Sequence, residues 1–454
     1  MQWLIQAGRW AYRWGPLVGT FALLVFICIN RVDPDFGWHY ATGQYIWSFG
    51  VPQHDIFTYT ARDFAWVNHE WAYSALVYLV ASTWSYTWLG VLFAGLWLGA
   101  LWLAVGRRPS WITMSLAVGA VIQYVGIRGI TWSAVGLAIT LWLLRRRRGY
   151  WLLVPMAAIW ANVHGGFVIG LAIASLAAVW RREWYLGGWI GIAGLAAMLN
   201  PYGWRVYEEI WRTMSDGKLA GRIVEWAPLS PTPATAPYVV LIIVLVLTMH
   251  GWGFDRVRAI GLIVAALWSN RHMPMLVVGT IGLFDHTVRR IQTLWQSRMG
   301  KRGAGLVPVL VVAIGVAYPL LLLFWRWPLS TSPQTLDRPT QALAALRDSP
   351  CRGNVFNDYT YGGLMIMSLP GVPVYIDGRM PSWRGPEGSY LDRYVQVLKG
   401  EEIMQSEFAR YDVQCVLLSD FDAVLSETLA KDQRWRQTIK AQNAELWRRD
   451  SVGD

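Results

Sequence analysis

Long apolar runs, repeated from about residue 14 to residue 326, constrain this chain more than any other feature. Many of them are close to the length that a helix needs to cross the hydrocarbon core of a bilayer. Hydrophobic residues make up 54% of the chain, and its mean hydropathy is +0.30. The 30 tryptophans fit a chain that meets lipid headgroups, where one edge of the indole ring is wet. The pattern therefore predicts an all-α polytopic membrane domain.

The basic residues gather in short clusters between these runs, an arrangement that speaks against a nucleic-acid partner despite the net charge of +11. The clusters are Arg9 with Arg13, Arg107 with Arg108, Arg145 to Arg148, Arg181 with Arg182, Arg256 with Arg258, and Arg289 through Arg302. The positive-inside rule places them, and the N-terminus, in the cytoplasm. Crossings are then expected near residues 14–30, 109–127, 130–144, 149–163, 166–180, 184–199, 237–250, 257–270, 273–286 and 304–326, with one more between 70 and 106.

The region between residues 70 and 106 decides the topology. It has room for two spans, or for one span and a short interfacial or re-entrant helix. One net crossing is preferred, because two would put Arg145 to Arg148 outside. This gives about 11 transmembrane helices. The first run lacks a small-residue cleavage site and is expected to remain as an anchor.

After residue 327 the composition changes to that of an ordinary globular domain, so we divide the chain into 1–327 and 328–454. Apolar β-like runs occur at Asn354–Asn357, Val372–Ile376 and Val413–Leu418. Helical patterns lie near Gln341–Arg347, Tyr390–Lys399, Glu402–Tyr411 and Ala423–Lys431. Their alternation predicts a small α/β domain on the extracytoplasmic side.

Cysteine usage leaves two alternatives for this tail. Cys351 and Cys415 could form a disulfide in an oxidising compartment, or remain two unpaired buried thiols. Cys28 lies in the first span, where a thiol behaves as a small hydrophobic group.

Polar motifs converge on the external face of this topology. Three of them fall in the first external loop, residues 31–70, and the others follow later crossings. Polar and ionisable groups are expensive at membrane depth, so their gathering at one interface favours a site there. We expect Asp33, His69, His164 and Arg271 to line one cavity that opens to lipid.

Taken together, these motifs resemble the GT-C superfamily, and most closely bacterial membrane proteins with a GT-C-like core and an external C-terminal domain. D-P-D at 33–35, G-x-P at 50–52 and W-x-x-H-E-W at 66–71 look like the first external loop of these enzymes. The likeness extends over most of the chain through W-A-N-V-H-G-G at 160–166, N-P-Y-G at 200–203, E-W at 225–226, N-R-H-M-P at 270–274 and Y-I-D-G-R at 375–379.

The resemblance implies transfer of a sugar from a polyprenyl-phosphate-linked donor to an acceptor glycan, lipid or protein. It places the protein in the bacterial cytoplasmic membrane, with the transfer on the extracytoplasmic face. A carboxylate in the first external loop is the recurring requirement of such enzymes, and Asp33 and Asp35 match its position. A positioned carboxylate can take the proton of the acceptor nucleophile. The D-x-D spacing also suits a divalent cation, Mg²⁺ or Mn²⁺, beside a phosphate leaving group.

Structural alternatives stand beside these roles. Asp33 with Pro34 can cap a helix that begins near Phe36. Turn chemistry explains Asp55, next to His54, nearly as well as catalysis does. Asp377 with Gly378 most simply makes a turn, with Arg379 pairing with a nearby acid.

The remaining candidates, together with His54 and Asp55, are expected to bind substrate. His69 and Glu70 either contact the acceptor or a metal, or simply open a helix. His164 precedes two glycines at a helix break, where an imidazole can donate to a phosphate. Arg128, Glu225 and Arg271 lie near span ends. Such arginines usually snorkel to headgroups, but one or two could clamp the carrier phosphate.

Three functions stay open at this point. The first is a glycosyltransferase that uses a lipid-linked donor. The second is a lipid-linked glycan ligase or polymerase, which needs external arginines and a histidine but no D-x-D. The third is a non-catalytic GT-C-like scaffold within a protein complex. A transporter is disfavoured, because the halves of the chain show no paired broken helices.

Overall fold

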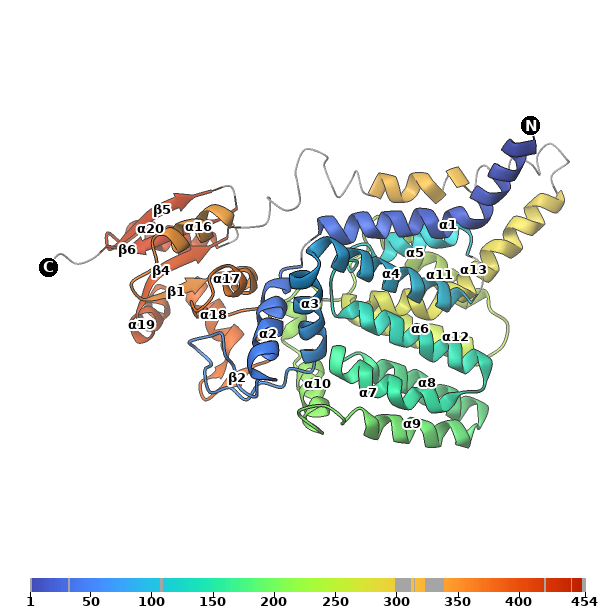
Figure 1. Ribbon diagram of the computed structural model, residues 1–454, viewed down its shortest axis with the longest axis horizontal. Coiled ribbons are helices and arrows are strands. Elements are labelled where there is room, and N and C mark those ends of the chain that lie inside the picture. Colours follow the sequence, from blue (N-terminus) through green and yellow to red (C-terminus); the bar gives the residue numbers. More distant parts are fainter. Residues whose placement is uncertain are drawn as a thin grey trace. The chain divides into compact units, whose positions relative to one another are not determined.

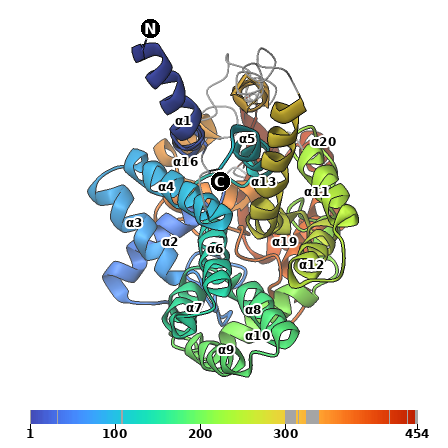
Figure 2. The same cartoon turned by 90° about the vertical axis from the view of Figure 1, so that its right-hand side faces the viewer.

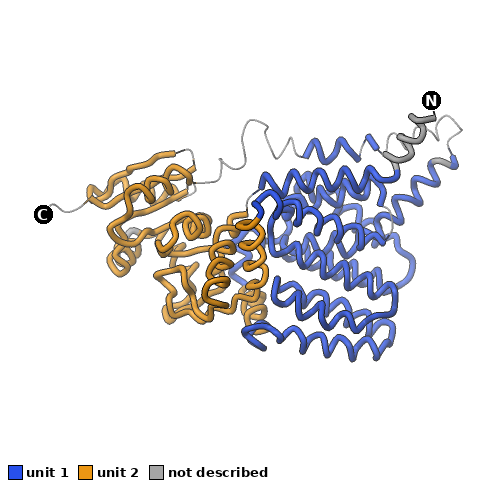
Figure 3. The backbone as a smooth tube through the Cα atoms, in the orientation of Figure 1, with its two compact units in different colours: residues 1–31, 84–206, 217–330 blue, residues 32–83, 207–216, 331–454 orange. Residues whose placement is uncertain are grey.

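The computed structural model describes residues 2–31, 33–106, 109–298, 312–313, 315–322, 339–419, 422–441 and 443–450. Within them the chain is mainly helical, with a small sheet towards the C-terminus, as the sequence predicts. Contacts between Cα atoms divide the chain into two compact units, coloured separately in Figure 3. Unit 1 comprises Met1–Arg31, Trp84–Val206 and Gly217–Ser330, and unit 2 comprises Val32–Thr83, Tyr207–Asp216 and Thr331–Asp454.

Unit 1 is built from apolar helices packed side by side. Figure 1 shows α6, α7, α8 and α9 running alongside one another, and Figure 2 views the same helices end-on. The helices of unit 1 are α1 (Gln2–Asn30), α4 (Tyr86–Val105), α5 (Trp111–Val121), α6 (Ile130–Arg146), α7 (Leu153–Val163), α8 (Phe167–Arg181), α9 (Trp184–Ala196), α11 (Ala236–Thr248), α12 (Phe254–Trp268) and α13 (Met273–Arg298). Short 3₁₀ turns lie at Tyr150–Leu152, Leu219–Gly221 and Asn270–His272.

Two helices of the described residues are long and apolar enough to cross a membrane, Arg13–Asn30 within α1, and α4. This corrects the predicted number of about eleven spans. Most of the other apolar runs give shorter helices, because turns interrupt them, and the longer α13, with 26 residues, includes a polar second half. The predicted crossing 149–163, for example, begins as a 3₁₀ turn and leaves an α7 of 11 residues, which is about 16 Å long. The predicted crossing 304–326 lies largely outside the described residues, of which 315–322 are helical.

The region between residues 70 and 106 contains two helices of unequal length. α3 (Trp71–Thr83) has 13 residues, and α4 has 20. Only α4 reaches spanning length. This agrees with the preference for one crossing and one short helix.

Unit 2 joins the first external loop to the tail. The predicted boundary between residues 327 and 328 separates them, whereas the structure groups 32–83 with the tail. The loop supplies α2 (Phe36–Phe49), which packs against both α3 and α17 (Gly362–Ser368). Backbone bonds between Tyr59 N and Val374 O (3.1 Å), and between Val374 N and Phe57 O (2.9 Å), tie the rest of the loop to the tail.

The tail is the predicted α/β fold with two additional strands. Its sheet has the order β1-β4-β6-β5, in which β1 (Asn354–Asn357) pairs parallel with β4 (Val413–Leu418). β6 (Glu445–Arg449) pairs antiparallel with β4 and with β5 (Trp435–Lys440). The remaining elements are α10 (Arg205–Ser215), most of which falls in unit 2, α16 (Thr340–Asp348), α18 (Tyr390–Lys399), α19 (Glu401–Arg410), α20 (Ala423–Lys431), and the small hairpin of β2 (Arg384–Gly385) and β3 (Gly388–Ser389).

The predicted strands at 354–357 and 413–418 and the four predicted helices are confirmed. The run 372–376 differs, because it forms only isolated bridges from Val374 to Thr58 and Val355. Pro373 lacks the N–H that a ladder needs. β5, β6 and α17 were not predicted. In β5, Arg436, Thr438 and Lys440 are exposed, whereas the residues between them are buried or partly buried. This alternation along the strand is the signal that identifies β5.

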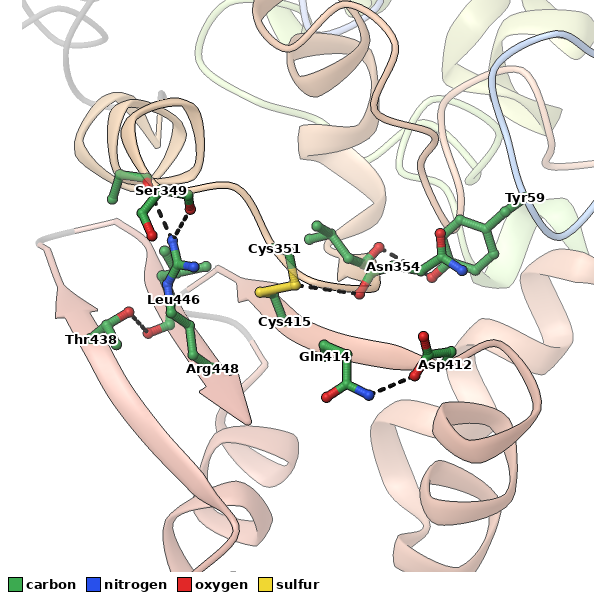
Figure 4. Close-up of a disulfide and its surroundings, with 12 residues drawn as sticks. Tyr59, Ser349, Cys351, Asn354, Asp412, Gln414, Cys415, Thr438, Leu446 and Arg448 are labelled. Atoms are coloured by element: carbon green, nitrogen blue, oxygen red, sulfur yellow. Dashed lines mark hydrogen bonds between the residues drawn. A yellow bond between two sulfur atoms is a disulfide. The ribbon is translucent and has the colours of Figure 1, made fainter. Parts of the chain in front are cut away.

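The two tail cysteines form a disulfide, which resolves the alternative left open by the sequence (Figure 4). It joins the segment before β1 to β4, with a Cα–Cα distance of 6.1 Å. Cys28 remains a buried free thiol in α1. The disulfide therefore secures the parallel pair of β1 and β4 at one side of the sheet.

Candidate functional site

The first candidate carboxylate, Asp33, lies at the start of α2. Its Oδ1 accepts a hydrogen bond from the amide of Asp35 (2.8 Å), and its backbone carbonyl accepts one from Phe36 (3.0 Å). The side chain is buried. These bonds form a turn directly before α2, which begins where the sequence predicts. The N-cap residue of the helix is Asp35, whose side chain makes no capping bond, so the capping alternative for Asp33 stays a prediction.

Asp35 is the more accessible of the two acids. Its Oδ1 accepts a hydrogen bond from Trp38 Nε1 (3.0 Å). The same oxygen lies over Gly378 of the tail, where a side-chain Cβ would come within 2.0 Å of it. Glycine is needed at position 378 for this close approach. The D-P-D and Y-I-D-G-R motifs therefore meet inside unit 2.

Asp55 belongs to a sealed cluster with two residues of the tail. Arg379 Nη1 lies 2.7 Å from Asp55 Oδ1, and Arg379 Nη2 lies 2.6 Å from Asp377 Oδ2. Their side chains are 0–1% exposed. Burial alone would lower the pKa of Arg379, but the two carboxylates raise it above its usual value. The guanidinium is therefore held in its charged form.

Aromatic rings enclose this cluster. The guanidinium carbon of Arg379 lies 4.5 Å from the ring centroid of Trp66 and 5.2 Å from that of Trp383. Asp55 Oδ2 also accepts hydrogen bonds from the amide (2.9 Å) and hydroxyl (2.6 Å) of Thr58. These bonds are the ones expected if Asp55 forms a turn, which is the structural alternative to a catalytic role. Its neighbour His54 is exposed.

Glu70 lies between two imidazoles. Its carboxylate oxygens are 3.4 Å from His39 Nε2 and 3.7 Å from His69 Nε2. His39 Nδ1 is 2.9 Å from Ser74 Oγ. Burial, together with the charges of His69 and Arg379, lowers the pKa of His39 well below its usual value. A neutral His39 therefore links α2 to the start of α3.

His164, in unit 1, ends α7. The amide of Gly166 donates to His164 Nδ1 (3.0 Å), so this nitrogen carries no proton. Ser133 Oγ of α6 is 2.6 Å from the same nitrogen and also accepts a bond from Trp160 Nε1 (3.0 Å). A Cβ at Gly166 would lie 2.1 Å from Ser133 Oγ. These bonds give the histidine and the second glycine of its motif a role in packing α7 and α8 against α6.

Arg128, Glu225 and Arg271 gather in unit 1. Arg128 Nη2 donates to Glu225 Oε1, and the amide of Arg271 donates to the Glu225 carbonyl (2.9 Å). The Arg271 guanidinium lies 5.0 Å from the ring centroid of Trp226. Gln123 and Tyr124 bond to Asn270 from the opposite side, through Gln123 Nε2 to Asn270 Oδ1 (3.2 Å) and the Tyr124 hydroxyl to the Asn270 carbonyl.

Arg31 completes this group, which we call the arginine cluster (Arg31, Arg128, Glu225 and Arg271). Burial would raise the pKa of Glu225, but Arg128 and Arg271, with a smaller effect from Arg31, hold it below its usual value. The Arg128 guanidinium contacts the carboxylate, whereas Arg271 and Arg31 act on it through their charges, so three positive charges and one negative charge leave an excess of two positive charges. The Glu225 side chain is 36% exposed and that of Arg128 is 16% exposed. The arginine cluster therefore combines positive charge with access from outside.

The predicted site residues thus fall into several sets. Arg128, Glu225 and Arg271 belong to the arginine cluster. Asp55 belongs to the sealed cluster. His69 lies beside Glu70, which also approaches His39. The predicted cavity draws on both units, and it stays a prediction. Among the described residues, no group of three or more His, Cys, Asp or Glu side chains could hold a metal ion. The divalent cation also stays a prediction.

Sequence reasoning missed several contributors. Arg31 directly follows the first span, but it is not part of an arginine run. Gln123 and Tyr124 lie at the end of a buried helix, and polar residues there are a signal that could have found them. His39 and Ser74 gave no such signal, because their contact depends on the packing of α2 on α3.

Comparison with known proteins supports the fold. The structure is similar to the crystal structure of the Archaeoglobus fulgidus oligosaccharyltransferase in the apo form, with a TM-score of 0.56 and 12% identity over 90% of this chain and 70% of that chain. A second structure of that enzyme, tethered through a disulfide bond to an acceptor peptide containing the NVT sequon, gives a TM-score of 0.53 with the same identity and coverage. No family model and no curated protein matches the chain. The likeness shows that the chain has a fold similar to that of this oligosaccharyltransferase.

Proposed function

We propose that the chain is a membrane glycosyltransferase of GT-C type. It moves a sugar from a polyprenyl-phosphate-linked donor to an acceptor at the extracytoplasmic face of a bacterial cytoplasmic membrane, with its N-terminus in the cytoplasm. The observation that carries this proposal is the arginine cluster within a GT-C-like fold. Its excess positive charge suits a phosphate group, which arginine binds bidentately.

Apolar surface supports membrane placement of unit 1. Large apolar side chains are exposed along its helices, including Val179 at 67%, Leu195 at 68% and Leu247 at 70%. Apolar side chains exposed on this scale are unusual in a soluble protein and typical of a lipid-facing surface. Together with α1 and α4, they favour a unit surrounded by lipid.

The proposed chemistry assigns a role to each set of residues. Arg128 and Arg271 bind the carrier phosphate and stabilise the charge that grows on it as the glycosidic bond breaks. Asp35 takes the proton of the acceptor nucleophile, because it is more accessible than Asp33, whose carboxylate is bonded to the Asp35 amide. His69, Glu70 and His164 stay proposed contacts of the substrates.

A lipid-linked glycan ligase or polymerase is a second candidate. It is favoured by the bonds of Asp33 and Asp35 to α2, because such an enzyme needs the arginines but not the D-x-D. A non-catalytic scaffold would need neither the arginines nor the D-x-D motif.

Transfer from a lipid-linked sugar, measured for wild type and for Asp35→Asn and Asp33→Asn in nanodiscs, tests the proposal. Asparagine caps a helix as well as aspartate does, but it takes no proton. A general base at Asp35 predicts a fall in turnover of about 10² or more, with unchanged thermal stability. Unchanged turnover in both variants would remove the catalytic assignment and favour the ligase. A wild type that transfers no sugar would favour the scaffold.

A further inference from the structure

Unit 2 contains a surface pocket that none of the roles above uses. It lies beside the β2–β3 hairpin and is lined by tyrosines and by two pairs of arginine and glutamate. The tyrosines are Tyr375, Tyr390 and Tyr411. All of the lining residues belong to unit 2, so the pocket is a feature of this unit alone.

The charges of the pocket are balanced. Arg410 Nη1 lies 2.6 Å from Glu387 Oε2, and Arg393 Nη2 lies 2.7 Å from Glu407 Oε1. The Tyr375 hydroxyl donates to the other Glu407 oxygen (2.8 Å). An anion would have to displace a carboxylate from its guanidinium, so this charge arrangement disfavours a phosphate or an acidic ligand.

The walls offer flat aromatic surface beside these polar groups. The rings of Tyr375 and Tyr411 are perpendicular, with an interplanar angle of 89° and centroids 6.2 Å apart. Tyr390 adds a third ring, half-buried at the start of α18. Tyrosine presents an apolar face and a polar hydroxyl together. A ligand that has both apolar faces and many hydroxyl groups fits this lining.

The hairpin connects the pocket to solvent. Glu387 is exposed at its tip and reaches Arg410 at the end of α19. Gly388 adopts φ +105°, which favours glycine, and so permits the tight turn that carries Glu387. The exposed ion pair of Glu387 and Arg410 is therefore the part of the lining that a ligand meets first.

We propose that this pocket binds a neutral saccharide, which serves as the acceptor glycan or as part of it. The arginines and glutamates supply donors and acceptors for sugar hydroxyls. Tyr375 is buried at 3% exposure, so the half-buried rings of Tyr390 and Tyr411 cover the apolar faces of the sugar ring. The term acceptor rests on the proposed function, whereas saccharide binding does not.

Direct binding to the full chain in lipid nanodiscs tests this assignment. Maltoside detergents are avoided, because they are sugars themselves. The probes are maltotriose and chitotriose, with glucose 6-phosphate and inorganic phosphate as anionic comparisons, measured by saturation-transfer NMR and calorimetry. We expect millimolar binding of at least one neutral trisaccharide and no competition by phosphate.

Arg410→Ala and Arg434→Ala form a matched pair of variants. Both arginines are half exposed, at 47% and 50%, and each pairs with a carboxylate, but Arg434 does not line the pocket. Exposed pairs add little to stability, so both variants should melt as the wild type does. Arg410→Ala should weaken saccharide binding about tenfold, as expected when a hydrogen bond from a charged group is lost, and Arg434→Ala should leave it unchanged.

Three results would overturn the assignment: no binding of either trisaccharide, equal affinity in Arg410→Ala and wild type, or displacement of the sugar by phosphate. Failure of the proposed function is a separate result. In that case the wild type would bind saccharides through this pocket but transfer no sugar from a lipid-linked donor.

Discussion

The arginine cluster of unit 1 and the sealed cluster of unit 2 are both built from guanidiniums and carboxylates. Guanidiniums are in excess in the arginine cluster, and carboxylates are in excess in the sealed cluster. The sealed cluster holds one guanidinium between two carboxylates, all but fully buried. The arginine cluster combines three arginines with one carboxylate, which is 36% exposed and is contacted by Arg128. A buried cluster whose carboxylates are already paired has nothing to offer a ligand, whereas an accessible cluster with excess positive charge attracts an anion. This difference separates a structural ion pair from a candidate binding site.

Arg379→Ala should break the sealed cluster and have the largest effect. It leaves Asp55 and Asp377 buried without their counter-charge, which typically costs about 3–5 kcal/mol. We expect loss of the cooperative unfolding of unit 2 at its normal temperature, measured by calorimetry, and faster proteolysis of the tail. Arg434→Ala is the control, because its ion pair is exposed. If Arg379→Ala kept normal stability and lost only transfer, the sealed cluster would be functional.

The disulfide should have the next largest effect. Cys415→Ser opens a loop with a sequence separation of 64 residues, and losses of this kind cost about 2–4 kcal/mol. We expect a lower melting temperature for unit 2 but an unchanged affinity of the arginine cluster for anions. Reduction of the wild type with dithiothreitol should reproduce the shift, whereas Cys415→Ser, which has no disulfide to reduce, should not respond to it. Cys28→Ser keeps the disulfide and should behave as the wild type does. Equal melting temperatures of wild type and Cys415→Ser would contradict the account of unit 2.

A third cluster, in unit 2, has no arginine and instead places two carboxyl groups, of Asp358 and Asp422, around the hydroxyl of Ser419. Ser419 Oγ lies 2.6 Å from Asp358 Oδ2 and 3.4 Å from Asp422 Oδ2. Burial, and then the Asp358 charge, raise the pKa of Asp422 to about 8. Since the pKa is higher in the folded state, the contribution of Asp422 to stability is present at low pH and is lost as pH rises towards 8.

Asp422→Asn should therefore flatten this pH dependence. We expect the wild-type unit 2 to melt several degrees lower at pH 9 than at pH 6, and the variant to melt at similar temperatures at both. Glu402→Gln, on the exposed face of α19, serves as the control. An identical pH profile in wild type and Asp422→Asn would show that Asp422 does not carry the proton.

Much of the fold could be predicted from sequence, because it depends on local pattern. The apolar runs predicted the helices of unit 1, and the runs 354–357 and 413–418 predicted the parallel strands β1 and β4. The role of Asp55 could not be predicted in the same way. Its partner Arg379 comes from the far end of the chain, and only the packing of the first loop on the tail brings the two together.

The candidate site was predictable only as separate residues. Arg128, Glu225 and Arg271 each stand out as polar residues near the ends of apolar runs, but sequence gives no sign that they meet. His164 is a different case, because its two glycines suggested an approach to a ligand, and its binding role stays a prediction. In the structure Gly166 lies against Ser133 instead, so the glycine pattern reflects helix packing.

Binding of a polyprenyl phosphate by Arg271→Ala, measured in nanodiscs against wild type, tests the central claim most directly. Arg128→Lys, which keeps the charge but loses the bidentate fork, and Arg434→Ala, which lies outside the arginine cluster, accompany it. If the arginine cluster holds the carrier phosphate, Arg271→Ala should bind it at least about tenfold more weakly, Arg128→Lys should lie between, and Arg434→Ala should match wild type, all at unchanged stability. Equal affinity of Arg271→Ala and wild type would contradict the account.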